Sequence, residues 1–171
     1  MRVLVAYASA AGSTAGVAER ITGVLQARGH DVALRSVDDV EGAEHYDAFV
    51  LGSAVHNQAW LPSASDFLAK QRLVLHGKPV WLFSVGSPGA LRGPFRRWAM
   101  LEENDILARL LDIVTPVEHR LFTGVVTNTT FGRLGALVFR ALGGRFGDFR
   151  DWDAIEKWGA SIADALADQK S

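Results

Sequence analysis

The feature that most constrains the fold is the N-terminal stretch, in which an apolar run gives way at once to a loop of small residues and then to a helical pattern. The apolar run covers Val3–Ala8, and the loop Ser9–Thr14 consists only of serine, alanine, glycine and threonine. A continuous apolar run is typical of a buried parallel strand. Small side chains let backbone N–H groups close around an anion, and the next helix points its positive end at the same place.

The composition of this loop excludes two common nucleotide motifs. It has no lysine, whereas the Gly-x-x-x-x-Gly-Lys-Ser/Thr loop needs one to reach the outer phosphates. It also lacks the Gly-x-Gly-x-x-Gly spacing of dinucleotide-binding folds. The remaining hydroxyl and amide groups suit a single phosphate monoester. The alternative is structural, because Ser13 or Thr14 would also serve as the cap of a helix that follows a buried strand.

Strand-like and helix-like patterns alternate along the rest of the chain. We expect strands at about 2–8, 31–36, 48–51, 80–85 and 120–126, and helices at about 14–28, 62–76, 104–114 and 151–166. Five strands that alternate with helices predict a parallel α/β sandwich. In such sheets, ligands bind beyond the carboxyl ends of the strands, where the strand order reverses.

Length and composition predict one domain over residues 1–171. The chain has no cysteine and a formal net charge of −1. The absence of cysteine excludes disulfides and thiolate metal sites and is consistent with a cytoplasmic protein. The near-zero net charge gives no indication of nucleic-acid binding. No segment is long enough for a signal-peptide core or a membrane span. We expect no metal site, because none of the following histidines has a metal-ligand spacing to a carboxylate: His30, His45, His76 and His119.

Three loops of small polar residues follow predicted strands one, three and four. They are Ser9–Thr14, Ser53–Asn57 and Ser84–Gly89. Because the carboxyl ends of parallel strands meet at one edge of a sheet, we expect the three loops to form one binding site.

These segments resemble the flavodoxin family. Ser9–Thr14 is similar to the family's Thr/Ser-x-Thr-Gly-x-Thr phosphate loop, with Ala11 in place of the middle hydroxyl. The resemblance covers essentially the whole chain and implies a three-layer sandwich around a five-stranded parallel sheet, with FMN as cofactor. It implies the following cofactor-binding residues: Ser9, Ala10, Ala11, Gly12, Ser13, Thr14, Ser53, Ala54, Val55, His56, Asn57, Trp60, Ser84, Val85, Gly86, Ser87, Pro88 and Gly89.

Within this fold, the chain resembles the group that includes menaquinone-dependent protoporphyrinogen oxidase. The residues that carry this resemblance include Leu51–Val55, Leu121–Gly124 and Gly147–Trp152. It implies an FMN-dependent oxidoreductase that takes hydride from an organic substrate, such as a porphyrinogen, and passes electrons to a quinone or a protein acceptor. Two alternatives remain: an electron-transfer flavodoxin, and a fold relative that binds another phosphate ligand or a deazaflavin.

Charge in the flavin loops favours an enzyme over an electron carrier. The three loops contain no Asp or Glu, whereas electron-carrying flavodoxins typically place acidic side chains around the flavin. A basic, aromatic segment with Arg92, Arg96, Arg97 and Trp98 follows the third loop. It suits an aromatic carboxylate substrate or an anionic membrane surface, which would make the protein membrane-peripheral. The alternative is a solvated loop with ion pairs to Glu102 and Glu103.

Two further features leave their roles open. His56 is the only histidine in a flavin loop, and it is either an acid–base group near the ring or an ordinary loop residue. The apolar stripe Leu134–Leu142 has helical spacing and fits either core packing or membrane contact.

Overall fold

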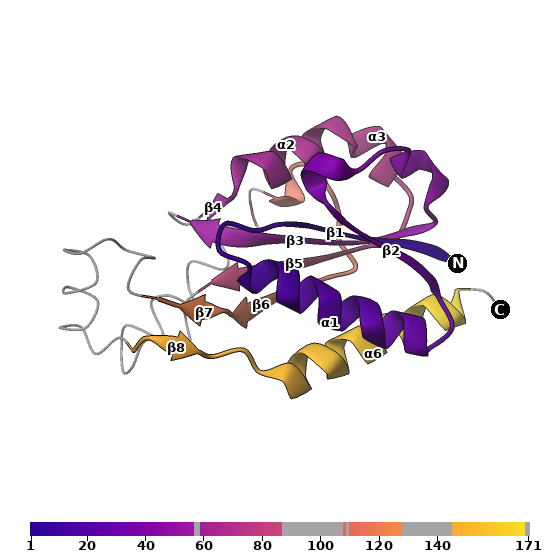
Figure 1. The fold of residues 1–171 in the computed structure, drawn as a ribbon. Coiled ribbons are helices and arrows are strands. Elements are labelled where there is room, and N and C mark those ends of the chain that lie inside the picture. The colour runs from indigo at the N-terminus through magenta and orange to yellow at the C-terminus, as the bar shows by residue number, and fades with distance from the viewer. Residues whose placement is uncertain (57–58, 87–107, 109, 128–144, 170–171) are drawn as a thin grey trace.

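The computed structural model describes residues 1–56, 59–86, 108, 110–127 and 145–169 (Figure 1). Five parallel strands form the central sheet in the order β2-β1-β3-β5-β6. Their bounds are β1 Arg2–Ala8, β2 Asp31–Ser36, β3 Ala48–His56, β5 Val80–Gly86 and β6 Glu118–Thr123. The chain moves from β1 to β2 on one side and then crosses back to β3 on the other. This reversal opens a crevice at the carboxyl ends of β1 and β3.

Helices cover both faces of the sheet and make three layers. Helices α1 (Ser13–Ala27) and α6 (Trp152–Asp168) lie on one face, and α2 (Pro62–Lys70) and α3 (Arg72–Leu75) on the other (Figure 1). Each face has its own apolar core, because alternate strand residues point to opposite sides. The predicted α/β sandwich with five parallel strands is therefore confirmed.

In the last helix, α6, a capping residue and the spacing of the apolar residues determine where the helix begins and which face is buried. Asp151 accepts a hydrogen bond from the backbone N–H of Ala154 at 3.0 Å and caps α6. The buried residues follow at helical spacing and pack against α1 and the sheet: Ile155, Trp158, Ile162 and Leu166. The predicted bounds agree with the observed helix within two residues.

Strand β3 is longer than predicted, because Gly52 and Ser53 do not end it. The strand pairs with β1 as far as Ser53 and with β5 as far as Ala54. It then pairs antiparallel with the short strand β4 (Ala59–Trp60), through Val55 and His56. Residues predicted as a loop are therefore strand residues. Gly52 marks a close approach rather than a turn, since a Cβ there would lie 2.0 Å from Cζ of Phe83.

The remaining differences concern short elements. The helix predicted from Pro62 is interrupted at Gln71, although hydrogen bonds from the Gln71 N–H to Phe67 and from the Leu75 N–H to Gln71 continue across it. Two 3-10 helices, η1 (Val37–Asp39) and η2 (Ala43–His45), join β2 to β3. Of the helix predicted over 104–114, residues 104–107 and 109 lie outside the described residues, 108 and 110–111 are helical, and 112–114 are not.

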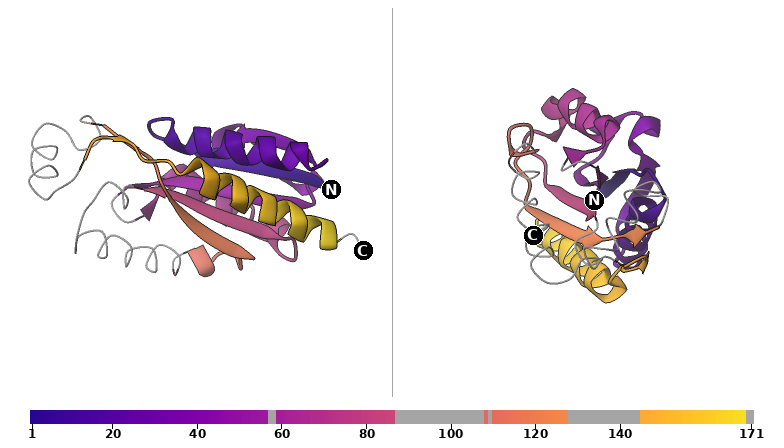
Figure 2. Two further views of the ribbon diagram at one scale, coloured as in Figure 1. Left: turned by 90° about the horizontal axis from the view of Figure 1, so that it is seen from below. Right: turned by 90° about the vertical axis from the view of Figure 1, so that its left-hand side faces the viewer.

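The predicted fifth strand also divides at Gly124. Its second part, β7 (Val125–Val126), leaves the main sheet and pairs antiparallel with β8 (Gly147–Asp148). This β7–β8 ribbon lies at the end of the molecule where the parallel strands finish (Figure 2). Among the described residues, no helix is long and apolar enough to cross a membrane.

We predict that Gly52→Ala destabilises the protein by about 3 kcal/mol, the upper part of the usual cost of overpacking. The added methyl group would meet three ring atoms of Phe83 within 2.3 Å, and Phe83 is itself fully buried. Urea unfolding of the purified variant measures this cost. Adding Phe83→Leu to Gly52→Ala should restore part of the stability, whereas wild-type stability in Gly52→Ala alone would contradict the close approach.

Candidate functional site

A cavity of about 100 Å³ lies at the carboxyl ends of the parallel strands. Its walls come from the loop after β1, the end of β3, the residue that follows β4, the end of β5 and the start of the β7–β8 ribbon. The lining residues are Ser9, Ala10, Ala11, Ser13, Thr14, Ala54, Val55, His56, Leu61, Val85, Gly86, Gly124 and Val125. The three predicted loops therefore do contribute to one site. Its volume is below the ~300–1,000 Å³ of most small-molecule pockets and suits one small group such as a phosphate.

Helix α1 begins at this cavity without a capping side chain. Its N-cap is Gly12, with φ 86°, and no side chain within the described residues bonds to the first turn as a cap. The alternative in which Ser13 or Thr14 caps the helix is therefore wrong. The Ser9 hydroxyl oxygen instead accepts from the Gly12 N–H at 3.0 Å, and the Ser13 hydroxyl oxygen accepts from the Val125 N–H at 3.1 Å.

Thr14 differs from both serines. Its side chain is 1% exposed, and its hydroxyl oxygen has no hydrogen-bond partner among the described residues. A buried hydroxyl without a partner is costly. The Thr22 hydroxyl and His30 Nδ1 also lack a partner among the described residues, but of the three residues only Thr14 lines the cavity, where a bound group could accept from it. The first N–H groups of a helix also lack intrahelical partners and carry partial positive charge. This turn can thus donate several hydrogen bonds to an anion.

Gly124 lets the β7–β8 ribbon lie directly against this turn. A Cβ at Gly124 would be 2.8 Å from Cγ1 of Val85 and 3.2 Å from Cβ of Ser13. The Gly124 N–H also donates to the carbonyl of Gly86 at 2.9 Å. Sequence reasoning missed Leu61, Gly124 and Val125 as site residues. Gly124 had a sequence signal, because a glycine inside a predicted strand, here 120–126, often marks a bulge or a close backbone approach.

Four predicted cofactor-binding residues that the structure describes do not line the cavity: Gly12, Ser53, Trp60 and Ser84. Ser53 and Ser84 are fully buried, and Trp60 is 5% exposed. The Trp60 Nε1–H donates to the Ser84 hydroxyl oxygen at 2.7 Å, and the Ser53 hydroxyl oxygen accepts from the Leu61 N–H at 3.0 Å. Ser84 also contacts Nε2 of His119 at 2.9 Å. Ser53 bonds inside the protein because β3 continues past its predicted end, and Ser84 does so because it lies within β5.

The other predicted residues divide between the cavity and the rest of the chain. Ala54, Val55, Val85 and Gly86 line the cavity, and His56 lies at its exposed side. Several lie outside the described residues: Asn57, Ser87, Pro88, Gly89, Arg92, Arg96, Arg97 and Trp98. The stripe Leu134–Leu142 lies outside them as well.

Charge is sparse around the cavity. Among its described lining residues, only His56 has an ionisable side chain. An ion pair at the end of β8 joins Asp148 and Arg150. The hydrogen-bonded guanidinium of Arg150 lowers the pKa of the Asp148 carboxyl. No three His, Cys, Asp or Glu side chains of the described residues are grouped as a metal site.

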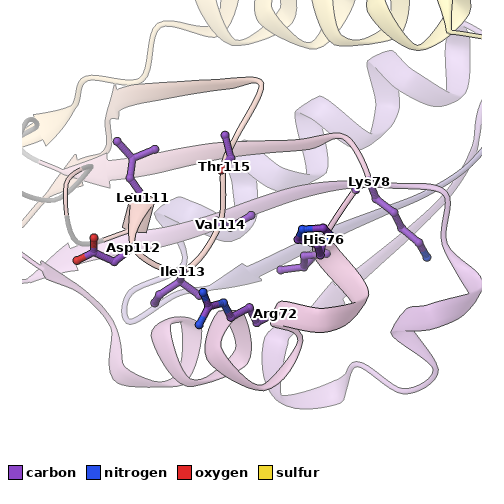
Figure 3. Close-up of a pocket in the computed structure, with 10 residues that line it drawn as sticks. Arg72, His76, Lys78, Leu111, Asp112, Ile113, Val114 and Thr115 are labelled. Carbon is purple, nitrogen blue, oxygen red and sulfur yellow. The ribbon is translucent and has the colours of Figure 1, made fainter.

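A second cavity, of about 410 Å³, lies where β5 begins, at the opposite edge of the sheet (Figure 3). Arg72, His76 and Lys78 contribute cationic or ionisable side chains to it. The Lys78 ammonium, however, donates to the backbone carbonyls of Glu44 and Tyr46 at 3.0 and 2.6 Å. This edge holds the amino ends of the strands, so it is not where this fold usually binds ligands.

Comparison with known proteins identifies the family. A family model described as a flavodoxin domain matches residues 4–136. The chain belongs to the flavodoxin domain family. A search of curated proteins found no match.

Solved flavodoxin structures share the fold over nearly the whole chain. A flavodoxin from the domain Archaea is 19% identical, with a TM-score of 0.62, and 98% of this chain aligns with 99% of that chain. Flavodoxin 2 from Bacillus cereus is 25% identical, with a TM-score of 0.57 and 99% coverage of both chains. The flavodiiron protein from Giardia intestinalis is 18% identical, with a TM-score of 0.62; 97% of this chain aligns with 36% of it.

FMN is the cofactor of the flavodoxin family and its structural relatives. The residues present here fit its phosphate group. The first turn of α1 presents helix N–H groups, and the buried Thr14 hydroxyl in that turn has no partner among the described residues. Backbone N–H groups at a helix N-terminus are a common phosphate site.

We predict that Ser13→Ala and Thr14→Val have opposite effects on the protein without ligand. Ser13→Ala leaves the Val125 N–H without its acceptor and should lower the free energy of unfolding by about 1 kcal/mol. Thr14→Val removes a hydroxyl that has no partner and should leave the free energy of unfolding unchanged or raise it. Chemical denaturation of the apoprotein measures both. A clear loss of stability in Thr14→Val would contradict the unpartnered hydroxyl.

Proposed function

We propose that this chain is an FMN-binding electron-transfer domain whose cofactor phosphate binds at Ser9–Thr14 and the first turn of α1. The observation that carries the proposal is the buried Thr14 hydroxyl without a partner among the described residues, in a turn that offers helix N–H donors. Membership of the flavodoxin family supports FMN as the phosphate ligand.

The roles of the loop residues differ in this proposal. Thr14 donates its hydroxyl to a phosphate oxygen, together with backbone N–H groups of the turn. Ser9 and Ser13 act indirectly, because their oxygens already accept from the Gly12 and Val125 N–H groups and thereby fix the shape of the loop. With Ala11 in place of a hydroxyl residue, the phosphate relies mainly on Thr14 and the backbone.

The flavin ring would lie beyond this cavity, past the carboxyl ends of β3 and β5. The described part of that region is apolar, with Ala54, Val55 and Val85 along the cavity wall. FMN, when bound, accepts and releases electrons in one- or two-electron steps. The protein holds the phosphate, keeps water from one side of the ring with apolar side chains and leaves His56 at the exposed side.

Electron transfer is favoured over substrate oxidation by the scarcity of acid–base groups. His56 is the only ionisable side chain among the described residues of the cavity. Transfer of single electrons through an exposed ring edge needs no protein acid or base. The alignment over nearly the whole length of solved flavodoxins supports the same function.

A second candidate is an FMN-dependent oxidoreductase of the protoporphyrinogen oxidase type. The observation that favours it lies in the sequence: the segments 9–14, 53–57 and 84–89 contain no acidic residue, and a basic segment with Arg92, Arg96 and Arg97 follows. Arginine side chains would recognise the carboxylates of a porphyrinogen. In this candidate function, His56 would exchange a proton with the substrate through its imidazole nitrogens.

We predict that the purified protein binds FMN and that Thr14→Val weakens this binding by about tenfold to a hundredfold, since a hydrogen bond to a charged group contributes about 1.5–3 kcal/mol. Riboflavin lacks the phosphate, so its binding should be the same in wild type and Thr14→Val. Fluorescence titration with both flavins measures the four affinities. A wild-type protein that binds no FMN, or binds a deazaflavin instead, would contradict the proposal.

We predict that anaerobic reduction of the FMN-loaded protein proceeds in two separate one-electron steps, as an electron carrier requires. Spectroscopic titration with dithionite at controlled potential measures the steps. One two-electron step, together with reduction of the protein by protoporphyrinogen, would support the oxidoreductase instead. His56→Ala then separates the two further, because it should slow substrate oxidation but not dithionite reduction.

A further inference from the structure

The β7–β8 ribbon and the residues next to it contact the first turn of α1 at two positions. Gly124 and Val125 lie against Ser13, as described above. Arg150, two residues after β8, reaches Gly16, the residue whose N–H closes this turn on the Gly12 carbonyl at 3.1 Å. The two contacts therefore bracket the segment that contains Thr14.

Asp148 and Trp152 hold the Arg150 side chain in place. Its Nε and Nη2 groups donate to the two carboxylate oxygens of Asp148, the first at 2.9 Å. Its guanidinium carbon lies 4.4 Å from the centre of the Trp152 ring. The Phe149 N–H donates to the carbonyl of Gly124 at 3.3 Å, so the residue before Arg150 is bonded to the residue that precedes β7. The Arg150 side chain is only 19% exposed.

The Arg150 guanidinium lies so close to Gly16 that any side chain at position 16 would displace it. A Cβ at Gly16 would lie 2.6 Å from Nη1 of Arg150. Glycine inside a helix is unfavourable relative to alanine, so the turn gives up helix stability at this position. The same helix has a second glycine, Gly23, where a Cβ would meet no atom within 4 Å. Gly16 thus differs from Gly23 by the guanidinium that rests on it.

We propose that Arg150 is a positioning residue for the FMN phosphate. By packing on Gly16, it holds the first turn of α1 against the β7–β8 ribbon. This inference rests on the proposed function, because the phosphate must bind in that turn for the position to matter. Several donors in one turn must point to one anion, and such sites need their groups held within about 0.5 Å. Arg150 does not contact the cavity and acts through Gly16.

The sharpest test is to fill the space at Gly16 while leaving Arg150 in the sequence. Gly16→Ala would displace the guanidinium, which is the far end of a flexible side chain. Gly23→Ala is the matched control, because it makes the same change in the same helix without any contact. We expect Gly16→Ala to weaken FMN binding about tenfold and to leave riboflavin binding within about twofold. Gly23→Ala should change neither affinity and should raise the Tm by about 2–4 °C.

Substitution of Arg150 itself separates its geometry from its charge. Arg150→Ala should match Gly16→Ala in the loss of FMN affinity. Arg150→Lys keeps the charge but loses the fork to Asp148 and the stacking on Trp152, so it should not restore binding. Arg20→Ala is the control for general damage at Trp152, because Arg20 also lies over this ring, at 4.9 Å, but its guanidinium donates to Glu156 of α6.

The affinities for FMN and riboflavin decide between the outcomes. The inference is overturned if Gly16→Ala and Arg150→Ala bind FMN as wild type does, or if they lose FMN and riboflavin affinity equally. If Arg150→Lys binds FMN with wild-type affinity, the positive charge is sufficient without the positioning contacts, and the inference is overturned as well. Should wild type itself fail to bind FMN, the proposed function fails instead, so the two failures are distinct.

Discussion

The first turn of α1 is the constraint on which the rest of the site depends, because it is fixed by backbone packing and not by a cap. Gly12 starts the helix with a left-handed conformation, and no side chain of the described residues bonds to its end. Gly124, which precedes the ribbon, packs closely against Ser13 of this turn. The helix N–H groups and the Thr14 hydroxyl therefore stay available to a ligand.

This arrangement explains why two serines and a threonine in one loop have different roles. Ser9 and Ser13 accept backbone N–H groups and shape the loop, whereas Thr14 has no partner among the described residues. The sequence motif treats all three hydroxyls alike. Only the fold reveals that two of them already accept hydrogen bonds within the protein, because the partner of Ser13 is a residue more than a hundred positions away in the chain.

The fold could be predicted from sequence further than the site. Buried parallel strands leave a strong apolar signal, so the number of strands and their positions in the chain followed from Val3–Ala8 and its counterparts. The end of β3 did not, because Gly52 resembles a turn residue but serves close packing against Phe83. Ser84 was predicted to bind the cofactor, but its hydroxyl takes part in a buried hydrogen bond with Trp60. The link between Arg150 and Gly16 depends on tertiary distance alone, and no local pattern encodes it.

The ³¹P NMR spectrum of the FMN-loaded protein as a function of pH tests the central claim most directly. Free phosphate monoesters titrate with a second pKa of about 6. Helix N–H groups and the Thr14 hydroxyl stabilise the dianion, so the bound phosphate should give one resonance that does not shift between about pH 5.5 and 8. A bound-FMN resonance that titrates like the free phosphate would contradict binding at the first turn of α1.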